Sequence, residues 1–63
     1  MIGMTKEEFR RQWEAVAEKI KTVEFIGGAI FATEYTSNDR VISIYLHDVY
    51  LGVVLLESVV RVN

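Results

Sequence analysis

Apolar residues recur at helical spacing near the start of the chain, and residues 28–62 form a nearly unbroken run of strand-type sequence with one polar break at residues 37–40. Near the start, the apolar positions share one stripe of a helix with about 3.6 residues per turn: Phe9, Trp13, Val16, Ala17 and Ile20. Most other positions there are charged, as on a helix surface that faces solvent. The pattern predicts an amphipathic helix over about residues 5–21, packed on strands through its apolar stripe.

Two signals around Thr5 mark the start of this helix. Thr5 and Glu8 have the spacing of a capping box, in which the hydroxyl accepts from the Glu8 amide and the Glu8 carboxylate reaches back to the Thr5 amide. Met4 and Phe9 have the spacing of a hydrophobic staple. We therefore expect the helix to begin directly after Thr5.

Residues from about 24 to 62 are rich in β-branched and aromatic residues, which favour strands. The double glycine at Gly27 and Gly28 predicts a bulge or sharp bend within a strand that resumes over residues 29–36. The polar residues 37–40 predict a hairpin turn, because Asn and Asp adopt left-handed or Asx-turn geometry. The N-terminal half of this part is thus expected to be a bent strand that enters a hairpin.

Strict alternation over residues 41–47 predicts the next strand. Ile42, Ile44 and Leu46 share one face, which we expect to face the core. The opposite face carries Val41, Ser43, Tyr45 and His47.

His47 and Asp48 predict a short turn into a strand over residues 49–56, with a bend at Gly52. A 3₁₀-like turn is expected over residues 56–59. A short closing strand follows, with apolar residues at Val59 and Val62.

The composition indicates a single small domain over residues 1–63 with an α+β fold. Half of the residues are hydrophobic (51%), more than one small core is expected to cover. Chains of this size are usually stabilised by disulfides, a metal or oligomerisation. The chain has no Cys and one His, so oligomerisation is the favoured solution, and we expect neither a metal nor another cofactor.

The net charge of −2 and the pI of about 5.2 argue against general binding to nucleic acid. The N-terminus becomes charged within a few residues and lacks the apolar region of a signal peptide. The longest apolar run, residues 53–56, is far shorter than the roughly 20 residues of a membrane span. These features predict a soluble, cytoplasmic protein.

Three phrases resemble a known group of small barrels: Gly-Ala-Ile at residues 28–30, Arg-Val-Ile-Ser-Ile at residues 40–44, and the hydrophobic ending at residues 54–62. Together they resemble SH3-like barrels of the Sm-like and YolD-like kind, over residues 28–62. The resemblance implies an N-terminal helix followed by a strongly bent antiparallel sheet or a small barrel. In the Sm-like family such chains form rings through strand-edge pairing and bind RNA.

His47, Asp48 and Glu57 are the candidates for acid–base chemistry. No nucleophile accompanies them in the sequence, so we interpret His47 and Asp48 as a polar turn at a strand end. The sequence predicts that the protein is not an enzyme. Catalysis would require a site that joins His47, Asp48 and tyrosines from neighbouring chains.

Several strands carry apolar residues on both faces, and a single helix cannot cover both. We therefore predict a homo-oligomer, with an interface that includes Phe31, Tyr45, Val53, Leu55 and Val60. Trp13 and Phe25 are instead assigned to the core. The candidate contacts to a ligand or partner are Asn38, Asp39, Arg40, His47 and Tyr50.

Together these features predict a non-enzymatic interaction protein that acts as an inhibitor or regulator. It would bind a protein partner or sequester a small ligand at the junctions between subunits. A small acidic chain of this style fits a phage or mobile-element origin. The alternative is an Sm-like ring protein that binds RNA.

Overall fold

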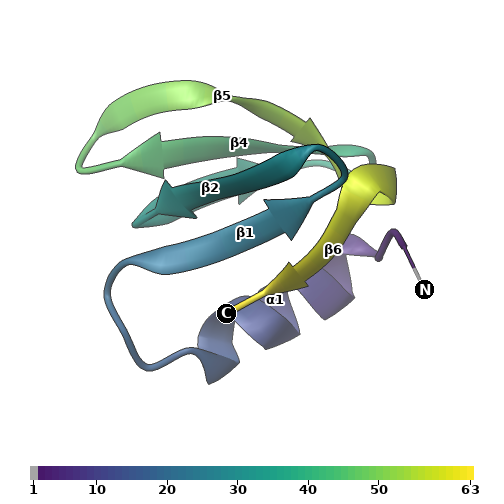
Figure 1. The fold of residues 1–63 in the computed structure, drawn as a ribbon, viewed down its shortest axis with the longest axis horizontal. Helices are drawn as coiled ribbons and strands as arrows, with labels where there is room; N and C mark the ends of the chain where they lie inside the picture. Colours follow the sequence, from purple (N-terminus) through teal and green to yellow (C-terminus); the bar gives the residue numbers. More distant parts are fainter. Residues whose placement is uncertain (1) are drawn as a thin grey trace.

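One helix precedes six strands in this computed structural model, which describes residues 2–63 (Figure 1). The elements are α1 (Lys6–Ala15), β1 (Lys21–Phe25), β2 (Gly28–Ala32), β3 (Glu34–Ser37), β4 (Val41–Leu46), β5 (Val49–Leu55), the 3₁₀ helix η1 (Leu56–Ser58) and β6 (Val59–Val62). The predicted α+β class is therefore confirmed, as is the 3₁₀ turn before the last strand. No helix in the described part of the chain is long and apolar enough to cross a membrane.

The start of α1 follows the prediction. The Thr5 hydroxyl accepts a hydrogen bond from the Glu8 amide at 3.1 Å, which satisfies one of the free amides of the first turn. The Glu8 carboxylate, however, accepts hydrogen bonds from Arg11 at 2.7 Å and from Gln12 at 3.0 Å. Glu8 thus ties the first two turns of the helix together.

The prediction that the helix reaches Lys21 is wrong, because α1 ends at Ala15 and Lys21 already belongs to β1. β1 is the central strand of its sheet and pairs on both sides, with β2 and with β6. The hydrogen bonds of β1 to both neighbours stabilise an extended backbone from Lys21 onward, so the helical pattern of the preceding segment does not continue into β1. Ile20, expected on the buried stripe, is consequently exposed.

The strands form two three-stranded antiparallel sheets, with the orders β2–β1–β6 and β3–β4–β5. The chain passes from one sheet to the other at Thr33, between β2 and β3. The continuous strand predicted over residues 29–36 is thus broken there. β5 and β6 are not paired with each other, so the sheets do not close into a barrel.

Gly27 and Gly28 lie at a hairpin turn rather than at a bend within one strand. Phe25 pairs with Gly28, so Ile26 and Gly27 form the two-residue loop between β1 and β2. Gly27 has a φ of 102°, which a residue with a side chain rarely adopts. The prediction of a strand running through the double glycine is therefore wrong. The glycines do mark the position where the chain changes direction.

The other predicted turns are confirmed. The Asn38 side chain accepts from the amides of Arg40 (2.8 Å) and Val41 (2.9 Å), the geometry of an Asx turn, between β3 and β4. His47 and Asp48 connect β4 to β5 with φ values of 50° and 69°, the positive pair required by a type I′ turn. Near Gly52 the register of β4 and β5 shifts, which marks a bulge at Leu51.

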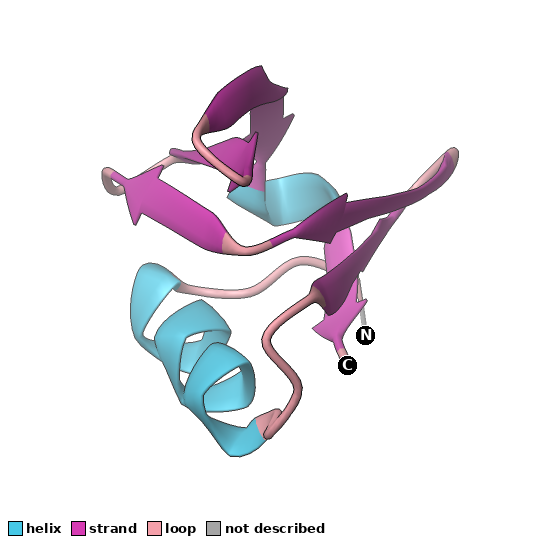
Figure 2. Cartoon of the chain, turned by 90° about the vertical axis from the view of Figure 1, so that its left-hand side faces the viewer, coloured by secondary structure: helices cyan, strands magenta, loops and turns pink. Residues whose placement is uncertain are grey.

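The core lies between the sheets and α1, which packs under one side of the strands (Figure 2). Val59 and Ile42 are completely buried, as is Ile44, whereas Leu46 at the end of its strand is half-buried. Trp13 and Phe25 pack against this core as predicted. The fully buried side chains of largest volume are Phe9, Ile42, Ile44, Val23 and Val59.

Candidate interaction surface

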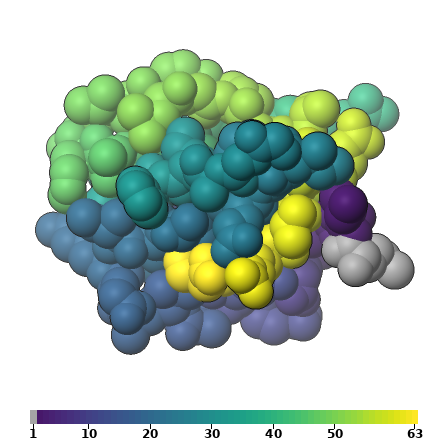
Figure 3. Space-filling view, in the orientation of Figure 1, coloured from purple at the N-terminus to yellow at the C-terminus, as the bar shows by residue number. Residues whose placement is uncertain are grey.

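The longest strand, β5, lies at the end of its sheet and pairs with β4 on one side only. Its seven residues, Val-Tyr-Leu-Gly-Val-Val-Leu, contain no charge and no proline. Edge strands usually carry charged residues or proline, which prevent another strand from pairing with them. In Figure 3 the light-green chain of β5 forms the upper border of the molecule.

Apolar side chains of β5 are unusually exposed. Val53 keeps 53% of its surface accessible and Leu55 47%. We call the exposed apolar residues of this strand the β5 surface, which comprises Val49, Tyr50, Leu51, Val53 and Leu55. A strand so apolar and so exposed is typical of an interaction site.

Tyr45, Val53 and Leu55 lie on one face of the β3–β4–β5 sheet. Val54 pairs with Ile42 and both are buried, so Val53 and Leu55, its neighbours, point to the opposite, outer face. Tyr45 lies on that outer face as well, but it is half-buried beside Tyr50, with 5.5 Å between the ring centroids. The structure thus brings together three of the five residues predicted for the interface.

Phe31 and Val60, the other two predicted interface residues, lie on the β2–β1–β6 sheet. Both are exposed, but they occupy its two end strands, with β1 between them. They therefore do not extend the β5 surface within its own sheet.

The backbone at the free edge of β5 pairs with no other strand, although the Leu55 carbonyl accepts a hydrogen bond from the Ser58 hydroxyl at 3.1 Å. The Leu56 amide donates to the Arg40 carbonyl at 2.8 Å, so Leu56 directs its amide toward the β4 side. Because this direction alternates along an antiparallel strand, Leu55 and Val53 direct their amides and carbonyls away from β4. These groups are where an added strand would bond.

An apolar groove of about 380 Å³ runs beside this edge. One wall is β5 from Leu51 to Leu55. Phe25, Ile26 and Ile30 of the β1–β2 hairpin form the other. An added strand would thus find hydrogen-bonding groups and an apolar wall side by side.

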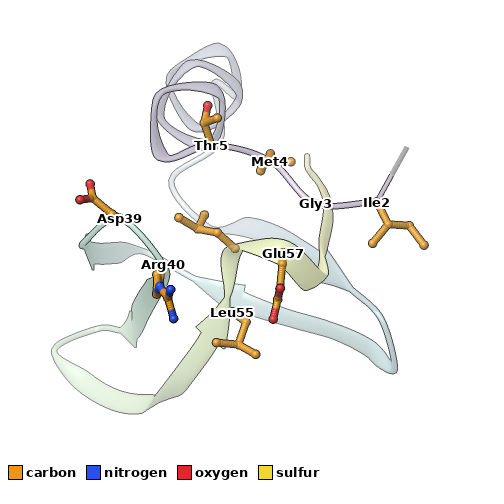
Figure 4. A pocket seen from close by; sticks show the side chains of 9 residues that line it. Ile2, Gly3, Met4, Thr5, Asp39, Arg40, Leu55 and Glu57 are labelled. Atoms are coloured by element: carbon orange, nitrogen blue, oxygen red, sulfur yellow. The ribbon is translucent and has the colours of Figure 1, made fainter.

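A second groove, of about 580 Å³, lies between the N-terminal segment and the β3–β4 turn (Figure 4). Arg40, Leu55 and Glu57 extend from neighbouring segments on the same side, whereas Asp39 points away from them. Asp39 instead accepts from the Lys6 ammonium at 3.0 Å, and this hydrogen bond, with the negative charge of Asp39, raises the pKa of Lys6. The groove therefore presents the Arg40 guanidinium and the Glu57 carboxylate beside apolar walls.

The candidate contact residues do not form one site. Arg40 and Asp39 line the second groove, while the Asn38 side chain is occupied within its own turn. His47 lies at the other end of β4, in the next hairpin turn, and Tyr50 follows on β5. Only Tyr50 belongs to the β5 surface.

The edge of β6 differs from that of β5. The Gly3 amide donates to the Val59 carbonyl at 2.8 Å, and the Val62 amide donates to the side chain of Gln12 at 2.8 Å. The N-terminal segment and α1 thus bond to the side of β6 that faces away from β1. Sequence analysis missed this role of Gln12, because a lone glutamine on a polar helix face gives no signal of a partner fifty residues away.

The described residues contain no cluster of His, Asp and Glu able to hold a metal ion. The class of protein that the fold and the surface define is a small α+β protein whose end strand β5 is uncharged and exposes apolar side chains. In comparisons with models of known protein families, with curated proteins and with solved structures, no match to the chain was found. The resemblance to Sm-like and YolD-like barrels thus stays a prediction.

Proposed function

We propose that this chain is a non-enzymatic interaction protein that works as a homo-oligomer in the cytoplasm. The observation that carries the proposal is the uncharged free edge of β5, with Val53 and Leu55 exposed beside it. Burial of apolar surface contributes about 25 cal/mol per Å², so covering these side chains favours association. An oligomer covers apolar surface that the small core leaves exposed.

Within such an oligomer, the second groove is the place where we propose that a protein partner or small ligand binds. Arg40 supplies a cation at the rim, and Met4 and Leu56 supply apolar walls. Because Glu57 lines the same groove, this combination suits a ligand or peptide that has an apolar body and polar groups able to bond both a guanidinium and a carboxylate. By binding such a molecule and keeping it from other partners, the protein would act as an inhibitor or regulator.

The experiment that tests self-association is a measurement of mass in solution at increasing concentration, by native mass spectrometry and light scattering. The wild-type protein is expected to exceed the mass of one chain below about 100 μM, which corresponds to roughly −5.5 kcal/mol of association. Val53→Lys places a charge on the open edge and is expected to leave monomers.

Thr36→Lys is the matched control, because Thr36 is an exposed residue of the same sheet on β3, away from the free edge of β5. It is expected to associate as the wild type does. A wild-type chain that stays monomeric over the whole range contradicts the proposal.

The alternative is an Sm-like ring that binds RNA. The observation in its favour is the element order, in which a helix precedes bent strands and a 3₁₀ turn precedes the last strand. An RNA site of this kind would use Arg40 and Arg61 around a central pore, but Arg61 pairs with Glu24 at 2.8 Å. Tight, saturable binding of short U-rich or A-rich RNA at physiological salt would favour the ring.

A further inference from the structure

The difference between the edges of β5 and β6 bears on how copies of the chain can pair. A head-to-tail arrangement, in which β5 of one copy pairs with β6 of the next, would generate a ring or a filament. It would require a new strand to displace the Gly3 bond to Val59 and the Gln12 bond to Val62. At the edge of β5 the corresponding bond is a single one, from the Ser58 hydroxyl to the Leu55 carbonyl at 3.1 Å, and a carbonyl oxygen has a second lone pair for an added strand.

We propose that the protein forms a closed two-fold dimer, in which β5 pairs antiparallel with β5 of a second copy. The two β3–β4–β5 sheets then form one continuous six-stranded sheet. This inference rests on the proposed function, because it specifies how the self-association takes place. A two-fold interface uses the same surface twice and leaves no open edge at the junction.

The backbone of β5 favours one register. Val53 and Leu55 are the residues that direct hydrogen-bonding groups away from β4 in the regular part of the strand. When the pairing is centred on Val54, Val53 of each chain lies opposite Leu55 of the other, and each pair exchanges two hydrogen bonds. A pairing centred on Val53 would instead place the bulged residue Leu51 opposite Leu55. The register centred on Val54 avoids this irregularity.

The side chains of the strand are compatible with pairing to an identical copy. A two-fold axis brings like residues close together, so any charge near the axis would be opposed by its own kind. β5 has no charged residue, and its outer-face neighbours across β4 are Val41 and Ser43. The pairing would thus join Val53 and Leu55 of both copies into one apolar cluster.

The groove beside the edge fits the same arrangement. The β1–β2 turn stands on the far side of this groove, and Ile26 at its tip is 58% exposed. A strand added to β5 lies in the groove and covers Ile26 together with Leu51. The second copy therefore covers exposed residues on both sides of the strand.

Cysteine cross-linking tests this pairing, because the natural chain has no cysteine. Single variants Val53→Cys and Leu55→Cys are mixed, one carrying a mass tag, and oxidised under mild conditions. Hydrogen-bonded antiparallel pairs place Cα atoms about 5.5 Å apart, within the range of a disulfide. The expected main product is the mixed 53–55 disulfide in a species of two chains.

The remaining variants distinguish the failure of this inference from that of the proposed function. A dominant cross-link between Val53→Cys and Val60→Cys, or between Val53→Cys and Phe31→Cys, would show pairing with β6 or β2 and overturn the two-fold dimer while self-association stands. A mass above two chains would do the same. Monomers without any cross-link would overturn both, and Thr36→Cys, on the opposite end strand β3 of the same sheet, is expected to remain unlinked.

Discussion

β5 and β6 are end strands of the two sheets, and their unpaired edges differ. β6 is short, is bonded by Gly3 and Gln12, and buries Val59 and Val62. β5 is longer, carries no charge, and exposes Val53. The comparison teaches that the helix and the N-terminal segment bond to the edge of β6, whereas the edge of β5 carries only the side-chain bond from Ser58 to the Leu55 carbonyl.

Truncation of Phe9, on the helix that bonds to β6, is expected to have the largest effect on stability. Phe9 is completely buried on α1 and packs against Trp13 and Tyr35, with ring centroids 5.9 and 4.8 Å away. Phe9→Ala is expected to cost about 3–5 kcal/mol of unfolding free energy, measured by urea denaturation.

Phe31→Ala is the control for Phe9, because Phe31 is 61% exposed. A surface change of this kind usually shifts the unfolding free energy by no more than about 0.5 kcal/mol. Equal effects of the two substitutions would contradict the assigned core.

Gln12→Ala removes the side chain that bonds the Val62 amide and therefore tests how the β6 edge is closed. We expect a loss of about 1 kcal/mol, the net worth of a typical hydrogen bond. Hydrogen exchange of the Val62 amide is also expected to become faster.

Arg11→Ala, one position earlier, removes an exposed side chain whose partner is Glu8 and is expected to leave the Val62 amide protected. Fast exchange in both variants would mean that the whole helix has loosened. Unchanged exchange in Gln12→Ala would contradict the closed-edge account.

A substitution in the turn that leads into β5 is expected to raise the unfolding free energy, by less than the losses above. Asp48 holds a φ of 69°, which glycine adopts without cost, so Asp48→Gly is expected to stabilise the protein by about 0.5–1 kcal/mol. Asp39→Gly, in the other hairpin turn, removes the Lys6 pair and is expected to give no gain. Thermal unfolding measures both, and an equal gain at Asp39 would contradict the assignment of strain to the type I′ turn.

The smallest expected effect is a pH dependence at Tyr35. Burial, and then the nearby charge of Glu14, raises the pKa of Tyr35 above its ordinary value of 10.0. Because the folded pKa is raised, this contribution to stability is complete below pH 10.0 and is lost as the pH rises through the folded pKa. Tyr35→Phe is expected to show a shallower loss of stability above that pH. A steeper loss in the variant would contradict the assigned cause.

Local signals in the sequence predicted local structure well. The Thr5 cap, the Asn38 turn and the 3₁₀ turn at Leu56 each depend on residues only a few positions apart. The errors lie where distant segments decide the structure. The helix ends early because β1 pairs with strands on both sides, and Gly27 forms a hairpin because β2 folds back on β1.

The candidate surface shows the same division. Alternation along β5 predicted that Val53 and Leu55 face away from the core, and the structure places both on the outer face. The sequence did not predict that the edge of β6 is bonded while that of β5 pairs with no strand, because this depends on where Gln12 and the N-terminal segment lie in the fold. The bulge that exposes Leu51 likewise becomes visible only once β4 and β5 are in register.

The central claim, that the open edge of β5 is an interaction surface, is tested most directly by hydrogen exchange at increasing protein concentration. The amides of Val53 and Leu55 point away from β4, whereas that of Val54 points toward it. The account predicts that exchange at Val53 and Leu55 slows as the concentration rises, while Val54 is protected throughout. Fast exchange at Val53 and Leu55 at every concentration would contradict it.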